Sequence, residues 1–219
     1  MPTPTPQMSE INSQALKLLV GIVAVILGNL TVWLSATALE SISASYYEDG
    51  ATRDFFVGLL FTIGAFLSAY NGITTLEKVL AKFAALASVC IAIFPCSCDP
   101  HQPRVPHVHY IAAAVMFLVL AVYCLIFYAR ARKKKTAHAS RRCVLYAACG
   151  AAISFAIAVM AFDAATGGSI SATVPRLTFY GERTGLIAFG ISWIVSGKLI
   201  PWIATSEERA ALFSSPVHG

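Results

Sequence analysis

Six long apolar runs dominate the chain, and short polar segments separate them. Each run approaches the roughly 20 mostly apolar residues that a helix needs to cross the hydrocarbon core of a bilayer. No stretch alternates apolar and polar residues in the ten-residue units typical of membrane β-barrel strands. The pattern therefore predicts an all-α membrane protein, a bundle of six transmembrane helices over residues 15–39, 55–73, 79–95, 108–129, 143–162 and 184–200.

The composition agrees with a membrane protein, and the polar ends of the chain predict how it is divided into parts. Apolar residues make up 57% of the chain and charged residues only 12%, against roughly a quarter charged in a typical soluble domain. Residues 1–13 carry no Lys or Arg and the first run is long enough to span, so we expect a retained helix and not a removable signal peptide. The expected parts are a flexible N-terminal tail (1–14), a six-helix transmembrane domain (15–203) and a short cytoplasmic tail (204–219).

The net charge of +5 is concentrated in one place, which predicts topology and argues against nucleic acid as a partner. Seven of the sixteen Lys and Arg residues lie between the fourth and fifth runs, and basic residues in short loops stay on the cytoplasmic side. An N-inside, C-inside arrangement puts twelve basic residues inside and four outside. The expected location is a bacterial inner (cytoplasmic) membrane, with membrane lipids as partners. Adsorption of the basic loop to anionic headgroups is an alternative role for these charges, less favoured than topology alone.

The segment between the first two runs, residues 41–54, is more polar than a surface turn requires. It holds three serines, two tyrosines, three acids and an arginine, and the predicted topology places it outside. The simpler interpretations are that Asp54 caps the second helix and that the tyrosines belong to the interfacial aromatic belt. The functional interpretation makes the segment one wall of an outward-facing pocket, with candidate residues Ser43, Tyr46, Tyr47 and Arg53.

Two acids at the outer ends of later helices extend this candidate site. Asp163 ends the fifth helix at a depth where a carboxylate is costly unless it is paired or hydrated. The nearest available cations are Arg53, Arg176 and Arg183, and Arg53 is the expected partner. Glu182 opens the sixth helix, where it either pairs with Arg53 or favours the helix dipole. The fifth helix is rich in small residues, which predicts a place at the centre of the bundle. With His109 at the start of the fourth helix, the predicted ligand-binding set is Ser43, Tyr46, Tyr47, Arg53, His109, Asp163 and Glu182.

The loop after the third helix gathers potential metal ligands and three prolines. The Cys and His residues concerned are Cys96, Cys98, His101, His107 and His109. Their spacing fits no strong zinc pattern, because Cys-x-Cys is not Cys-x-x-Cys. A proline-rich loop without a site is the favoured interpretation, and a metal site or a disulfide involving Cys96 and Cys98 remain alternatives.

Several short motifs resemble those of a group of uncharacterised six-helix bacterial membrane proteins, and more distantly those of DRAM-like proteins. They comprise a Ser-Ile-Ser stretch with two tyrosines, an Arg before Phe-Val-Gly, a Phe-Pro, a His opening the fourth helix, and a Glu before Phe-Gly-Ile-Ser-Trp. The positions are Ser41, Ser43, Tyr46, Tyr47, Arg53, Phe56, Val57, Gly58, Phe94, Pro95, His109, Glu182 and Trp193. The resemblance implies a six-helix fold but no activity, and it does not extend to the Cys-rich loop or the basic loop.

Three functions are compatible with these features. The favoured one is a non-enzymatic membrane protein whose extracytoplasmic polar pocket binds, senses or passes a small molecule, ion or lipid, without a cofactor. The second is a zinc-dependent intramembrane lipid hydrolase, by analogy with the seven-helix ceramidase and adiponectin-receptor superfamily. The third is a structural subunit of a membrane assembly. No nucleophile elbow or phosphate loop is present, so no catalytic residue is assigned. Small-residue helix faces are compatible both with packing inside the bundle and with homo-oligomerisation.

Overall fold

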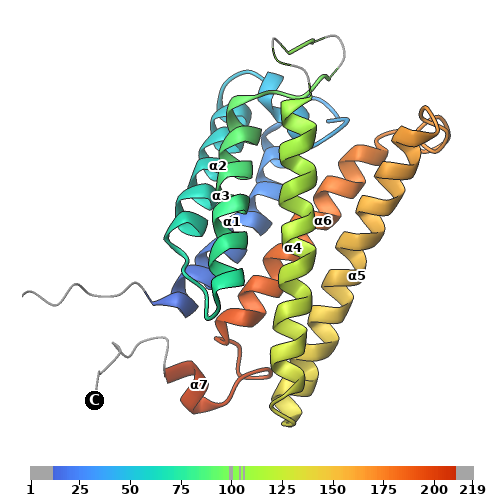
Figure 1. Ribbon diagram of the computed structural model, residues 1–219. Helices are drawn as coiled ribbons and strands as arrows, with labels where there is room; N and C mark the ends of the chain where they lie inside the picture. The colour runs from blue at the N-terminus through green and yellow to red at the C-terminus, as the bar shows by residue number, and fades with distance from the viewer. Residues whose placement is uncertain (1–11, 99–100, 104, 106, 211–219) are drawn as a thin grey trace, which may run out of the picture.

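A computed structural model describes residues 12–98, 101–103, 105 and 107–210 as a bundle of long helices (Figure 1). It confirms the all-α class, since the described residues form no strand, only an isolated bridge between Cys98 and His101. The elements are α1 (Ser13–Leu34), a 3-10 turn η1 (Ser43–Tyr47), α2 (Ala51–Ala69), α3 (Thr75–Ile93), α4 (Val108–Arg132), α5 (Ala137–Ala165), α6 (Leu177–Gly197) and a short α7 (Ser206–Ala210).

Four of the described helices are long and apolar enough to cross a membrane, namely α1, α2, α4 and α5. These four indicate an integral membrane protein. Large apolar side chains are also exposed on the outer faces of the helices, for example those of Phe83, Leu125 and Phe155. Helices α3 and α6 fall short by this measure; α3 carries Glu77, Lys78 and Lys82, and α6 carries Glu182 and Arg183.

Side-chain caps explain why several helices begin where they do. The side chains of Asn12, Thr74 and Thr136 accept hydrogen bonds from backbone amides at the starts of α1, α3 and α5. Such a cap satisfies one of the amides that the first turn leaves unpaired. The cap at Thr136 starts α5 six residues earlier than hydropathy suggests, so Arg141 and Arg142 are helical and not part of a loop. Helix α1 ends at Leu34, five residues before the end predicted from hydropathy.

Helix α6 is the central helix, which corrects the expectation that the fifth helix is central. It packs against α1 and α5 and also contacts α4. Twelve of its 21 residues are buried, whereas α5 buries seven of its 29. Glycines allow α6 to lie close to α1. Gly190 of α6 lies against Gly21 of α1, where a Cβ on Gly21 would come within 2.6 Å of the Gly190 carbonyl oxygen. The backbones therefore approach more closely than side chains would permit.

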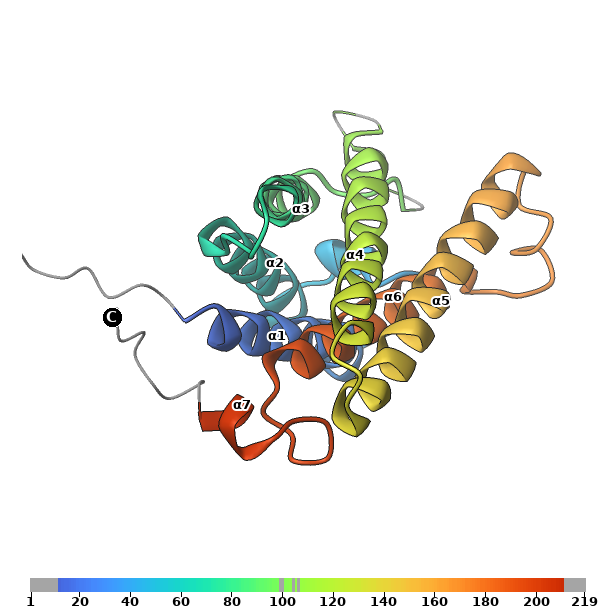
Figure 2. The same ribbon diagram turned by 60° about the horizontal axis from the view of Figure 1, so that its bottom comes forward.

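The bundle has two chemically different ends, named here by their main features. The disulfide end holds η1, the Cys96–Cys98 disulfide and the starts of α4 and α6. The basic end holds the starts of α1, α3 and α5, the α4–α5 connection and α7, and Figure 2 brings it toward the viewer.

Glu208 of α7 ties the C-terminal segment to the basic end. Its carboxylate pairs with Lys134 at 2.9 Å, Arg142 at 2.8 Å and Lys198 at 3.3 Å. Burial alone would raise the pKa of Glu208, but hydrogen bonds from Arg142 and Lys134 and the charge of Lys198 outweigh it. The net effect lowers the pKa to about 2. The carboxylate therefore stays ionised under all ordinary conditions.

Acidification is expected to weaken the attachment of α7. Because the folded-state pKa of Glu208 lies below its unfolded value, its stabilisation is full above about pH 4.5 and is lost as pH falls toward 2. The full shift corresponds to about 3 kcal/mol, and solvent screening of this partly exposed group reduces the expected loss to about 1–2 kcal/mol. Thermal unfolding in detergent between pH 6 and 2.5 measures it. Glu208→Gln should be less stable at pH 6 and should lack this part of the pH dependence, and equal pH profiles for both proteins would contradict the assignment.

Candidate functional site

A buried carboxylate and a serine meet at the disulfide end, from segments far apart in the chain. Glu182, the sixth residue of α6, accepts hydrogen bonds from the backbone N–H of Ser43 at 3.1 Å and from its hydroxyl at 2.8 Å. Glu182 is 9% exposed and Ser43 7%. The 3-10 turn of η1 presents both donors to one carboxylate, which fixes η1 against α6.

His109 completes this group, which we call the Glu182–Ser43–His109 chain. Its Nε2 lies 3.0 Å from the Ser43 hydroxyl oxygen and its Nδ1 lies 2.8 Å from the Phe94 carbonyl oxygen. A carbonyl oxygen only accepts hydrogen bonds, so Nδ1 carries a proton. The ring is 3% exposed and comes from the second residue of α4. The backbone of the α3–α4 connection therefore sets its tautomer.

Hydrogen-bond counting leaves two fully satisfied arrangements of this chain. Ser43 has one hydroxyl proton for two neighbours, Glu182 Oε1 and His109 Nε2. If it donates to the carboxylate, His109 must donate from Nε2 and is an imidazolium. If it donates to Nε2, Glu182 must itself donate and is a neutral acid. Both arrangements hold the same number of protons and have no net charge, so a shift of two protons through Ser43 interconverts them.

The Glu182–Ser43–His109 chain forms part of the wall of a cavity of about 440 Å³. Side chains from five segments line this space, which we call the disulfide-end cavity. Arg176, just before α6, is fixed at its edge, since its Nε donates to the Leu39 carbonyl at 2.6 Å and its guanidinium lies over the Phe179 ring at 4.2 Å. The other polar side chains around the cavity belong to Glu40, Ser41, Ser97, Tyr110, Ser171 and Thr178.

The disulfide between Cys96 and Cys98 also lines the disulfide-end cavity, and two tyrosines hold its loop. The Tyr47 hydroxyl donates to the Cys96 carbonyl at 2.7 Å, and the Tyr110 hydroxyl donates to the Ser97 carbonyl at 2.9 Å. Burial raises the pKa of the Tyr47 phenol, so this hydroxyl stays protonated and keeps donating.

The structure brings together only part of the predicted ligand-binding set. Ser43, His109 and Glu182 are in direct contact, and Tyr47 lies on the adjoining loop. Arg53 instead lies over the ring of Tyr46 at 4.7 Å, away from both predicted carboxylate partners.

Two further acids have local structural roles. Asp163 accepts hydrogen bonds from the backbone amides of Ile170 and Ser171 at 2.7 and 2.9 Å, so it organises the α5–α6 loop. Asp54 lies in the first turn of α2, but the N-cap of that helix is Gly50. Glu182 lies beyond the first turn of α6, so a first-turn dipole role does not account for it.

The five candidate metal ligands lie in different environments. Cys96 and Cys98 are joined in the disulfide, His101 stacks on Tyr47 at 4.2 Å, and His107 is the N-cap of α4 with a left-handed backbone. Among the described residues, no three His, Cys, Asp or Glu side chains are grouped as a metal site would require. The geometry of this part of the chain therefore adds no support to the zinc alternative.

Sequence reasoning missed two contributors to the site. The Phe94 carbonyl sets the His109 tautomer, and no side-chain pattern reveals a backbone acceptor. Arg176 is considered from the sequence only as an outside charge and as a possible partner of Asp163, not as part of the site. Its position after a glycine- and serine-rich loop, immediately before α6, was the available signal.

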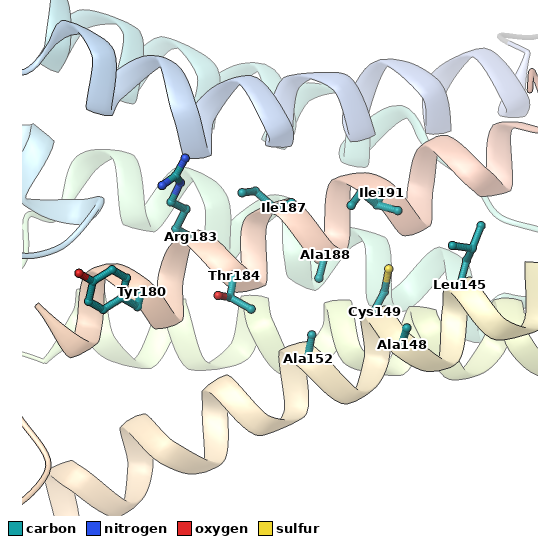
Figure 3. A pocket seen from close by; sticks show the side chains of 10 residues that line it. All are labelled: Leu145, Ala148, Cys149, Ala152, Tyr180, Arg183, Thr184, Ile187, Ala188 and Ile191. Atoms are coloured by element: carbon teal, nitrogen blue, oxygen red, sulfur yellow. The ribbon is translucent and has the colours of Figure 1, made fainter. Parts of the chain in front are cut away.

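A second hollow, of about 530 Å³, lies between α5 and α6 and is mostly apolar (Figure 3). Small side chains from both helices line it, including Ala148, Ala152 and Ala188. Arg183 turns from it toward α1, where it donates to the Asn29 side chain at 2.8 Å. This hydrogen bond explains how α6 carries an arginine at this depth.

Comparison with known proteins identifies no relative for this fold or site: no family model, curated protein sequence or solved structure matches the chain.

Proposed function

We propose that this protein is a non-enzymatic membrane protein that binds a small polar molecule, or the polar headgroup of a lipid, in the disulfide-end cavity. The six long helices would all cross a bacterial inner membrane, with both termini inside and the disulfide end outside. One observation carries the proposal: the Glu182–Ser43–His109 chain is buried yet forms part of the wall of a 440 Å³ cavity. A buried acid and imidazole are costly to maintain, and such groups concentrate at functional sites.

The order of the three groups favours binding over nucleophilic catalysis. In a serine nucleophile triad, the imidazole lies between the hydroxyl and the acid, so that it removes the hydroxyl proton while the acid orients it. Here the hydroxyl lies between the imidazole and the acid, and His109 is oriented by a backbone carbonyl. Ser43 thus links two titratable groups and is not presented as a nucleophile.

Ligand binding in this cavity would be coupled to the proton position. A cationic ligand group next to Glu182 would favour the arrangement in which Glu182 and His109 are both charged. A neutral donor or acceptor would favour the arrangement in which both are neutral, because a nearby charge stabilises the charged form of its neighbour. The two arrangements contain equal numbers of protons, so the switch needs no exchange with solvent. A cavity of this kind suits sensing or passage of a small molecule.

A ligand screen on the purified protein tests the proposal. Thermal unfolding in mild detergent would be followed with amino acids, carboxylates, amines, sugars and glycerophosphodiester headgroups. We expect at least one class to stabilise the wild type and to lose most of its effect in Ser43→Ala and Glu182→Gln. The matched control is Ser140→Ala, an exposed serine at the basic end. No stabilisation by any class, or equal loss in the control, would count against binding at this site.

Thiol labelling tests the predicted topology. Ala172→Cys places a thiol on the exposed α5–α6 loop of the disulfide end, and Lys135→Cys places one on the exposed α4–α5 connection. A membrane-impermeant maleimide applied to intact cells should label the first strongly and the second only after permeabilisation. The parent protein measures the background from its four free cysteines. If Lys135→Cys were labelled in intact cells and Ala172→Cys only after permeabilisation, the topology would be the reverse of the proposed one.

A further inference from the structure

A small cavity of about 60 Å³ at the basic end is surrounded by cations. Its lining includes Lys17, Arg130, Lys134, Arg142 and Lys198, contributed by α1, the α4–α5 region and the residue after α6. The volume is roughly four to six times the 10–15 Å³ that one ordered water needs. One small oxyanion fits such a space. We call it the basic-end cavity.

The described acids neutralise only part of this charge. Glu77 is paired with Arg130, and Glu208 is shared by Lys134, Arg142 and Lys198. Two carboxylates thus face five cations. Ion pairs partly removed from water are stable only when the charges are compensated. The excess positive charge makes the cavity attractive to an anion.

Lys17 is the feature that most strongly favours an anionic ligand in this cavity. It is 6% exposed, and its ammonium group has no hydrogen bond or ion pair with a described residue. Its nearest neighbours are aromatic faces, with the Tyr70 and Phe127 ring centres at 5.5 and 5.6 Å. Cation–π contacts offset part of the desolvation cost, but an aromatic face is a weak substitute for the oxygen acceptors that the three N–H donors of an ammonium group prefer. An anion in the adjoining cavity would supply them.

We propose that the basic-end cavity binds a phosphate group, either free or as the headgroup of an anionic lipid. A phosphate oxygen would accept from Lys17, and the planar guanidinium of Arg142, which is 2% exposed and already held by the Ile203 carbonyl at 2.6 Å, would orient the group. Lys198 lies at the end of α6, so the bound phosphate would join α1, α5 and the central helix. This site is separate from the disulfide-end cavity and does not depend on it.

Two sets of conditions distinguish the sources of phosphate. In detergent, inorganic phosphate at 10 mM is compared with chloride at equal ionic strength. In nanodiscs, phosphatidylglycerol is compared with phosphatidylcholine. We expect the melting temperature to rise by about 3 °C or more in at least one comparison. A shift with inorganic phosphate indicates a free anion, and a shift with phosphatidylglycerol alone indicates a lipid headgroup.

Matched lysine variants locate the effect. Lys17→Met and Lys198→Met should abolish most of the shift, whereas Lys133→Met, an exposed lysine outside the cavity, should retain it. If Lys17→Met does not fold, two measurements still test the proposal. One is the shift in Lys198→Met, and the other is native mass spectrometry of the wild type, which counts bound phosphate or phospholipid. No shift and no bound phosphate species in either setting, or equal losses in all three variants, would overturn the proposal. Neither result bears on the ligand screen at the disulfide end.

Discussion

Replacing Arg130 by alanine is expected to lower the free energy of unfolding by about 3 kcal/mol, at the lower end of the range for breaking a buried ion pair. Glu77 has a fully buried side chain, and the Arg130 guanidinium pairs with its Oε1. Without Arg130, the carboxylate would stay buried with its charge uncompensated. The remaining donors are the Tyr70 and Thr74 hydroxyls, at 3.2 and 3.1 Å, and the Ile73 backbone N–H at 3.4 Å, and they keep the loss from being larger.

The position of Glu77 gives this loss a wider consequence. Its backbone N–H donates to the Thr74 hydroxyl, which caps α3, and its carboxylate accepts from the same hydroxyl. Its carbonyl accepts from the Tyr123 hydroxyl of α4 at 2.5 Å. One residue thus fixes the start of α3 and its contact with α4. A less stable Arg130→Ala protein should therefore lose the α3–α4 contact early.

Thermal and denaturant unfolding in detergent measure the effect. Arg132→Ala is the matched control, because Arg132 is exposed on the same turn and makes no ion pair with a described residue. The double variant Arg130→Ala with Glu77→Gln should recover part of the loss, since it removes the unpaired charge. Equal stability of Arg130→Ala and Arg132→Ala would show that the pair contributes little.

Gly21→Ala and Gly190→Ala should each destabilise the protein by about 1–3 kcal/mol, the range for overpacking a close-packed contact. A Cβ on Gly21 would lie 2.6 Å from the Gly190 carbonyl oxygen, and one on Gly190 would lie 2.7 Å from the Gly21 carbonyl oxygen. Both obstacles are backbone atoms, which cannot move aside as a side chain can. Helices α1 and α6 would have to separate.

Two other glycines serve as controls, because an added Cβ would meet no obstacle at either position. A Cβ on Gly28, also between α1 and α6, would meet its nearest atom at 3.5 Å, an ordinary contact. A Cβ on Gly58 of α2 would meet nothing within 4 Å, so Gly58→Ala should stabilise the helix by about 0.5–1 kcal/mol. Thermal unfolding of the four glycine-to-alanine variants, measured in parallel, tests these expected differences in stability. If Gly21→Ala matched Gly28→Ala, the close approach of α1 and α6 would be refuted.

Separation of α1 and α6 would also reach the candidate site. Helix α6 carries Glu182 near its start, and Phe179 donates its backbone N–H to the Glu40 carbonyl at 3.1 Å. A shifted α6 would therefore lengthen the hydrogen bonds between Glu182 and Ser43. The glycine variants should weaken any ligand stabilisation more than Gly28→Ala does.

The candidate site could be predicted from sequence only in part. The unusual polarity of residues 41–54 points to Ser43, and polar residues at the ends of apolar helices point to His109 and Glu182; all three meet. Arg53 was paired with distant acids on charge alone, but the ring of Tyr46, seven residues away, lies closer. Asp163 was expected to need a cation, but two backbone amides of the following loop satisfy its carboxylate. Contacts between residues close in the chain cost less conformational entropy than contacts between distant residues. Charge patterns in the sequence do not show which of the possible partners a side chain takes.

The sequence alone determined the helical class, the approximate position of each long helix and the concentration of basic residues at one end. These properties follow from hydropathy and charge along the chain, which need no knowledge of neighbours. The tertiary structure decided which polar groups meet. Ser43 and Glu182 are 139 residues apart, and Ser43 and His109 are 66 apart. Their contact depends on the rotation of α4 and α6 and on the close approach that Gly21 and Gly190 permit, and both are set by packing between helices.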